Sequence, residues 1–344
     1  MTSEWSFAIV PVHTRSLRDV RVHPDEPLPA AIERIATGLA DRIVNVLETS
    51  KKDPNEAIHT ARKSMKRFRG LLRLIRDELG EEAYRRENEV LRESGRTLAP
   101  ARDAFVLGET LRALQERYGR MLAEDGFRYT QRYLSDRHQR ILEAAISDRQ
   151  TLATAADAVA EVQARLTDGR GPGTITEIRD DYAAVSSGLR RVYRRGRRGM
   201  HDALDSQRPE GFHEWRKRVK YLRYHMETLQ PLWPELIGAQ AKRLDELGET
   251  LGSEHDLTVL GDLLLREDIA CPDPAERWLL VALIHQRRAD LRTRAVILGQ
   301  SLYAETPTAF TQRMSGYWKS ARGRPPRFTG RRESLPRPPV ASRR

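Results

Sequence analysis

Apolar residues recur at steps of three or four along most of the chain, which is the spacing of amphipathic α-helices. The first helix is expected to begin near Pro29, because proline suits the first helical turn. Further helical patterns cover 54–79, 82–98, 103–118 and, after a break near Gly126, the residues up to Leu166. The pattern therefore predicts an all-α fold.

A stretch rich in glycine and proline, Thr167–Thr174, divides the chain. Beyond it the pattern restarts with an amphipathic helix whose apolar positions run from Ile175 to Val192. The helix that carries His213 follows and ends near Pro231, and further helical patterns cover 275–298 and 308–319. The expected organisation is an N-terminal arm (1–27), a first helical unit (28–168), a second helical unit (174–319) and a tail (320–344). The tail is rich in arginine and proline and too poor in apolar residues to fold, so we expect it to be disordered.

Two blocks of the first half reappear in the second half in the same order. Ile58–Asp77 matches Phe212–Gln230 at one constant offset, and Leu91–Leu107 matches Leu244–Leu260 at an offset one residue shorter. A single-residue difference in a loop accounts for the change in offset. Self-similarity of this kind indicates that a helical unit has been duplicated.

The first pair of matched blocks forms helices with one cationic face. At 100° per residue, one face of the first helix carries His59, Arg62, Lys63, Lys66 and Arg73. The corresponding face of the second helix carries His213, Arg216, Lys217, Lys220 and Tyr224. The opposite faces are apolar and include Phe68 and Trp215, which we expect in the core. A solvated helix face usually mixes acids and bases, so like charges in register indicate an external polyanion.

Composition agrees with an anionic partner. The 344 residues include 32% charged side chains and carry a formal net charge of +11, which favours nucleic acid, a membrane surface or a phosphate polymer. Most of the basic excess is arginine, whose planar fork matches phosphate oxygens. The only cysteine, Cys271, excludes an intramolecular disulfide and a thiolate metal cluster, and it fits a reducing cytoplasm. No apolar run approaches the roughly 20 residues that a membrane span needs, and the N-terminus does not resemble a signal peptide. We therefore expect a cytoplasmic protein without a membrane partner.

Other side chains leave alternatives open. His59 and His213 suit a metal ligand, a general base, a structural hydrogen bond or a hydrogen bond to phosphate, and the surrounding cations disfavour a metal. Asp103 and Asp256 suit either a helix N-terminus or the orientation of an arginine. A further basic strip on the helix before His213 holds Arg190, Arg194 and Arg197, beside Tyr193.

The motifs His59-x-x-Arg62-Lys63-x-x-Lys66-Arg67 and His213-Glu214-Trp215-Arg216-Lys217-Arg218-Val219-Lys220 resemble the CHAD family, the conserved histidine α-helical domain. The resemblance extends from about Leu28 to Trp318. It implies two tandem four-helix-bundle units related by pseudo-twofold symmetry, with basic residues lining a central pore or groove. It also implies binding of inorganic polyphosphate and association with polyphosphate granules.

The expected function is non-enzymatic binding of polyphosphate, without a cofactor or metal. The residues expected to line the site are His59, Arg62, Lys63, Lys66, Arg73, Arg190, Tyr193, Arg194, Arg197, His213, Arg216, Lys217, Lys220, Arg223 and Tyr224. The alternative is binding of nucleic acid by the same surface and the tail, although most aromatic residues lie away from the cationic faces and single-strand binders need them exposed. An enzyme of phosphate chemistry is disfavoured, since no Gly-rich phosphate loop, metal motif or carboxylate cluster is found. The oligomeric state is left open.

Overall fold

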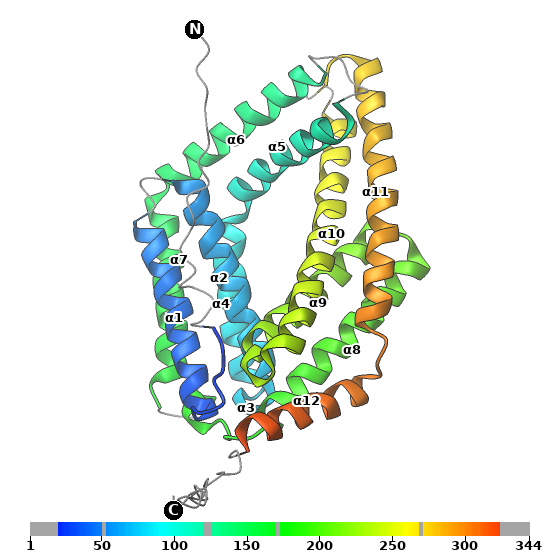
Figure 1. Ribbon diagram of the computed structural model, residues 1–344. Helices are drawn as coiled ribbons and strands as arrows, with labels where there is room; N and C mark the ends of the chain where they lie inside the picture. The colour runs from blue at the N-terminus through cyan, green and yellow to red at the C-terminus, as the bar shows by residue number, and fades with distance from the viewer. Residues whose placement is uncertain (1–19, 50–52, 120–125, 170–172, 268–270, 324–344) are drawn as a thin grey trace, which may run out of the picture.

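The structure, a computed structural model, describes residues 20–49, 53–119, 126–169, 173–267 and 271–323 (Figure 1). Within these ranges every regular element is a helix and no strand occurs, which confirms the all-α prediction. The predictions for residues 1–19 and 324–344, which cover most of the arm and of the tail, concern residues outside the described part of the chain.

In the first half, the described residues form the α-helices α1 (Leu28–Glu48), α2 (Pro54–Leu74), α3 (Arg76–Leu79), α4 (Glu81–Thr97), α5 (Ala99–Tyr118), α6 (Arg128–Ser147) and α7 (Arg149–Thr167). Local signals fix several ends. Asp53 caps α2 by accepting from the Glu56 N–H at 3.1 Å, and Asp148 likewise caps α7 and separates it from α6. Gly80 ends α3 with a φ of +78°, a conformation that favours glycine.

In the second half, the described residues form the short 3₁₀ helices η3 (Ile175–Glu177) and η4 (Gln230–Leu232) and the α-helices α8 (Ala183–Ser206), α9 (Pro209–Thr228), α10 (Pro234–Arg266), α11 (Pro274–Leu302) and α12 (Pro307–Arg322). The helix predicted to start at Ile175 begins only at Ala183. Its expected first turns are diverted because the Asp180 side chain accepts from the Leu28 N–H at 2.7 Å and ties this segment to α1.

Both ends of the described chain depart from the expected boundaries. Val20 and Val22 are buried, and the Val22 N–H donates to the Thr228 carbonyl at 2.9 Å, so the end of the predicted arm packs beside α9. At the other end α12 continues through Arg322, into the segment predicted as tail.

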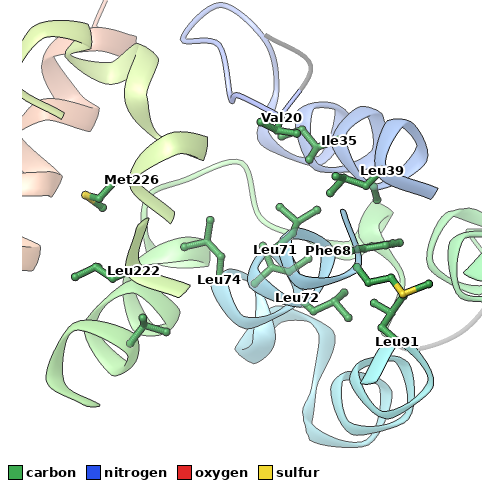
Figure 2. Close-up of a cluster of buried hydrophobic side chains, with 14 of the residues drawn as sticks. Val20, Ile35, Leu39, Phe68, Leu71, Leu72, Leu74, Leu91, Leu222 and Met226 are labelled. Atoms are coloured by element: carbon green, nitrogen blue, oxygen red, sulfur yellow. The ribbon is translucent and has the colours of Figure 1, made fainter. Parts of the chain in front are cut away.

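The helices pack as two groups that meet through α2 and α9 and through α5 and α10. In the first group α2 lies between α1 and α4, and α7 packs on α1 and α4. In the second group α9 lies between α8 and α10, and α11 and α12 pack on α10 and α8. Figure 1 shows the first group on one side of the molecule and α8–α12 on the other. A continuous apolar core extends from α1 to α12, and Figure 2 shows side chains of α2 and α9 within it.

Matched positions of the two repeats make matched contacts. A Cβ placed on Gly95 would lie 3.6 Å from the Met65 sulfur, and one on Gly248 would lie 3.8 Å from Val219, the counterpart of Met65. The second pair of matched blocks differs in its helices: Leu91–Leu107 is divided between α4 and α5 at Leu98, whereas Leu244–Leu260 lies within the continuous helix α10. These contacts agree with a pseudo-twofold relation between the units, which stays a prediction.

Candidate functional site

The two histidine-led helices, α2 and α9, cross at equivalent positions. Gly70 of α2 faces Tyr224 of α9, its counterpart in the repeat, and a Cβ on this glycine would lie 3.2 Å from Tyr224. The His225 Nε2 and the Gly70 carbonyl oxygen are 2.9 Å apart at the same crossing. The absence of a side chain at Gly70 permits this approach. The crossing brings the cationic faces of the two helices toward each other.

Four cations meet beside the crossing and form what we call the central cluster: Arg62, Lys66, Arg216 and Lys220. Desolvation and the charges of Arg62, Lys220 and Arg216 lower the pKa of Lys66 to about 7. Desolvation and Arg216 lower the pKa of Lys220 to about 8. Lys66 nevertheless remains exposed to solvent, so a ligand can reach it. The like charges of the two helices are therefore held together at an accessible place.

Aspartates of α5 and α10 lie next to the central cluster and neutralise only part of its positive charge. Arg62 donates to the Gly95 carbonyl at 3.1 Å and forms an ion pair with Asp103 at 3.4 Å. Burial raises the pKa of Asp256, while Arg216 and Lys220 act in the opposite direction. Asp103 and Asp256 lie inside α5 and α10, not at a helix start, which leaves the orientation of an arginine as the role that fits Asp103.

The histidines border the central cluster as neutral groups. Desolvation, followed by the charge of Arg102, lowers the pKa of His59. The His213 and His255 rings lie 4.2 Å apart, and desolvation together with His213 and Arg216 lowers the pKa of His255 to about 4. Among the residues that the structure describes, no three His, Cys, Asp or Glu side chains are grouped as a metal site would require. The arrangement suits hydrogen bonding by neutral imidazoles.

The outer residues of the cationic faces are partly neutralised within the protein. Lys217 pairs with Glu214 one turn earlier on α9. Arg223 binds Glu227 at 2.7 Å and also pairs with Asp245, so its guanidinium is held internally. Lys63 is exposed and lies close to this network of charges.

Two tyrosines predicted to contact the ligand are buried instead. Tyr224 fills the helix crossing and is only 7% exposed. Tyr193 is 0% exposed and stacks on Phe310 with ring centroids 4.1 Å apart. Its hydroxyl donates to the Glu305 carbonyl at 3.2 Å. Neither tyrosine belongs to the accessible surface of the site, because both serve the packing of α9 and α8.

The basic strip on α8 also lies away from the central cluster. Arg190 donates to the Thr308 hydroxyl at 2.9 Å, and Arg197 donates to the Tyr303 carbonyl at 3.3 Å. Arg194 on the same strip is exposed. This strip therefore faces the connection between α11 and α12.

Arg73, predicted as part of the same cationic face, lies beyond the crossing. Its guanidinium carbon is 4.0 Å from the centroid of the Tyr221 ring. There it shares a pocket with four arginines that sequence reasoning missed: Arg76, Arg191, Arg195 and Arg218. Gly188 is the feature of the sequence that indicates this packing, because a Cβ there would lie 2.1 Å from the Leu74 carbonyl oxygen. That glycine marks the face of α8 that packs on the end of α2, and Arg191 and Arg195 follow it at helical spacing.

The sequence of residues 32–265 matches the family model of the CHAD domain. This range includes α2, α5, α9 and nearly all of α10. The chain belongs to the CHAD family. This membership confirms the family resemblance of the two histidine-led motifs. Within the part of the chain that the structure describes, no helix has an apolar stretch that would cross a membrane.

Relatives of this CHAD domain are known by sequence and by structure. Two uncharacterized proteins of Mycobacterium tuberculosis, from strains CDC 1551 / Oshkosh and ATCC 25618 / H37Rv, are each 26% identical over 281 residues, covering 79% of this chain and 52% of theirs. The chain thus spans about half the length of these curated relatives. PptA from Streptomyces chartreusis is similar in structure, with a TM-score of 0.58, 17% identity, and coverage of 81% of this chain and 100% of its own. The CHAD domain from the plant Ricinus communis has a TM-score of 0.56, 21% identity, and coverage of 83% and 95%. These two structures support the fold.

Proposed function

We propose that this CHAD domain binds inorganic polyphosphate at the central cluster and does not process it. The observation that carries the proposal is the meeting of Arg62 and Lys66 with Arg216 and Lys220 from the matched helix, at an accessible place. Membership of the CHAD family supports polyphosphate-related binding at the level of the family. Association with polyphosphate granules is part of the same proposal.

The chemistry of the ligand matches that of the cluster. A phosphate polymer repeats negative charge along a flexible backbone, and distributed charge-assisted hydrogen bonds are the means by which a protein holds it. Like charges that repel one another in the free protein gain from such a ligand, because it supplies the missing counter-charge. Cations contributed by both repeats would contact one chain from two sides.

Binding is expected to strengthen with the length of the polyphosphate and to weaken steeply with salt. A longer chain reaches more of the cationic surface, and each neutralised charge releases counterions. Isothermal titration calorimetry with fractionated polyphosphate at several salt concentrations measures both effects. Affinity independent of chain length and salt would contradict the proposal.

Nucleic acid is the second candidate, favoured by the net charge of +11. The buried positions of Tyr193 and Tyr224 count against it, since single-strand binders use exposed aromatics to stack bases. Competition between polyphosphate, RNA and DNA at equal phosphate concentration separates the two. The control is a chain that ends at Gly323, because the arginine-rich residues after it carry a positive charge that attracts polyanions without regard to their chemistry. Preference of this shorter chain for nucleic acid would favour the alternative.

Absence of catalysis is also a proposal. Incubation of the purified protein with long polyphosphate and divalent metal ions should release no inorganic phosphate above background. Release that follows the protein through purification and depends on metal would instead indicate a polyphosphatase.

The pH dependence of binding follows from the two lysines of the central cluster. Their pKa values of about 7 for Lys66 and about 8 for Lys220 mean that both lose their charge as pH rises from 6 to 9. Affinity for polyphosphate should fall over this window, by roughly tenfold, and binding near pH 7.5 should take up protons because the polyanion favours the charged amines. Calorimetry in buffers of different ionisation enthalpy measures the uptake.

The matched control for this prediction is the double variant Lys66→Arg and Lys220→Arg. Arginine keeps its charge throughout the window, so the variant should show a flatter pH profile and little proton uptake. An equally steep profile in the variant would assign the titration to other groups.

A further inference from the structure

A second group of cations lies beyond the crossing of α2 and α9 and forms what we call the arginine pocket. It is lined by Arg73 and Arg76, by Arg191 and Arg195 of α8, by Arg218 of α9, and by Tyr84, Tyr221 and Val192. On α2, Arg73 follows the crossing residue Gly70 whereas Arg62 and Lys66 precede it, and none of the four cations of the central cluster lines this pocket. The arginine pocket is therefore a separate place on the molecule.

The protein balances only part of the positive charge of the arginine pocket. Arg191 pairs with Asp77 at 2.7 Å and Arg76 pairs with Glu81 at 2.6 Å. Arg218 reaches Glu214 at 3.4 Å, and Glu214 also pairs with Lys217. Within the described residues, Arg73 and Arg195 have no carboxylate partner, and a buried nitrogen of Arg191, Nη1, has no hydrogen-bond partner. The guanidinium groups of Arg73 and Arg195 are thus left without a carboxylate counter-charge within the described residues.

Two tyrosines hold the guanidinium groups of Arg73 on α2 and Arg76 on α3 in place. Arg73 lies over Tyr221 at 4.0 Å, and Arg76 lies over Tyr84 at 4.5 Å from the ring centroid. Such cation–π contacts stabilise an arginine without consuming its charge. Burial, together with the charges of Arg218, Arg76 and Arg191, lowers the pKa of Arg195. The pocket therefore holds its arginines close together at an electrostatic cost that an anion would relieve.

The corresponding hollow of the other repeat lacks this character. It is lined by Arg67, Tyr224 and Glu227 together with Val20, Ile35, Leu39, Leu71 and Thr228. Glu227 stands at the position that matches Arg73, and it neutralises Arg67 at 2.9 Å. The duplicated fold thus provides two hollows but only one that is cationic. The arginines are a property of this side of the molecule and not a requirement of the packing.

We infer that the arginine pocket binds a short phosphate chain, such as a triphosphate group, independently of the central cluster. A triphosphate presents closely spaced charged oxygens, and arginine is the side chain that binds them bidentately. Both tyrosine rings already contact arginines, so the recognised group is the phosphate chain itself. The inference extends the proposed function without depending on it.

The experiment uses tripolyphosphate as the probe in a protein whose central cluster is disabled by Lys66→Gln and Lys220→Gln. This protein should still bind one tripolyphosphate. Adding Arg195→Gln and Arg218→Gln should weaken binding at least tenfold, because two charge-assisted contacts are lost. Adding Arg243→Gln and Arg266→Gln removes the same charge from exposed positions of α10 and should change the affinity less than twofold. ATP in a parallel titration should bind no more tightly than tripolyphosphate.

The outcomes separate this inference from the proposed function. If the variant with Lys66→Gln and Lys220→Gln no longer binds tripolyphosphate, the inference about the arginine pocket is wrong. The same holds if both arginine pairs weaken binding equally. Either result leaves the proposal for the central cluster unaffected. ATP that binds while tripolyphosphate does not would also overturn it, since the nucleoside would then be the recognised group. Arg195 is exposed and Arg218 only partly buried, so the melting temperature should not change. If the melting temperature falls, the single variant Arg195→Gln replaces the pair, and it should also weaken the binding of tripolyphosphate.

Discussion

The double charge reversal Lys66→Glu and Lys220→Glu is expected to abolish the binding of long polyphosphate. Both lysines lie in the central cluster, where the charges of Arg62 and Arg216 help lower the pKa of Lys66 and the charge of Arg216 helps lower the pKa of Lys220. Two new carboxylates would pair with these arginines and remove their donors as well. Since a hydrogen bond to a charged group contributes about 1.5–3 kcal/mol, affinity should fall at least 100-fold, or about 2.8 kcal/mol. Calorimetry at physiological salt measures the loss.

A matched control keeps the same net charge. Lys242→Glu and Lys319→Glu lie at exposed positions of α10 and α12, and they should weaken binding only severalfold through the overall field. Thermal unfolding should show that the double variant at Lys66 and Lys220 is as stable as the wild type or more so, because like charges have been removed from a partly desolvated place. Binding within threefold of wild type, or an equal loss in the control, would place the site elsewhere.

The substitution Trp215→Ala is expected to produce the largest loss of stability. Trp215 is 0% exposed on the apolar face of α9, and the backbones of Gly199 and Gly299 pack around it. A Cβ on Gly299 would lie 2.5 Å from the indole, so the space around the ring is filled. Removing the ring leaves a cavity as well as lost burial, and the free energy of unfolding should fall by about 3–5 kcal/mol. Chemical denaturation measures the change.

The chain offers its own control for this substitution. Trp278 on α11 is 61% exposed, and Trp278→Ala should change the free energy of unfolding by less than about 0.5 kcal/mol. Similar losses for the two tryptophans would contradict the central place of Trp215 in the core. Folded Trp215→Ala protein should retain polyphosphate binding at low temperature, because the indole lies on the face of α9 opposite Lys220.

Much of the site was predictable because it depends on helical periodicity. Helical periodicity places Arg216 and Lys220 on one face and Trp215 on the other, whatever the neighbouring helices are. The repeated motif predicts the same separation between Lys66 and Phe68 in the first copy. Duplication also indicated that two like faces would come together. In the structure the charge of Lys220 helps lower the pKa of Lys66, so these two lysines of the matched faces lie near each other.

Other positions depended on which helix packs where. Periodicity placed Tyr224 beside Lys220, but the close approach at Gly70 buried it. Arg223 was predicted to face the ligand, yet Glu227, one turn later on α9, and Asp245, on α10, neutralise its charge. Sequence spacing contains no information on such partners.

The amino-acid sequence by itself determined the helices, their apolar faces, the repeat of the histidine-led motif and the cationic character of one face of each copy. These properties follow from residue order along a single helix. Only the tertiary structure decided which cations remain accessible, because that depends on the crossing at Gly70 and on carboxylates brought in from other helices. Arg73 and Lys66 share a face of α2, yet the packing of α8 on α2 places Arg73 in a different pocket, together with Arg191 and Arg195.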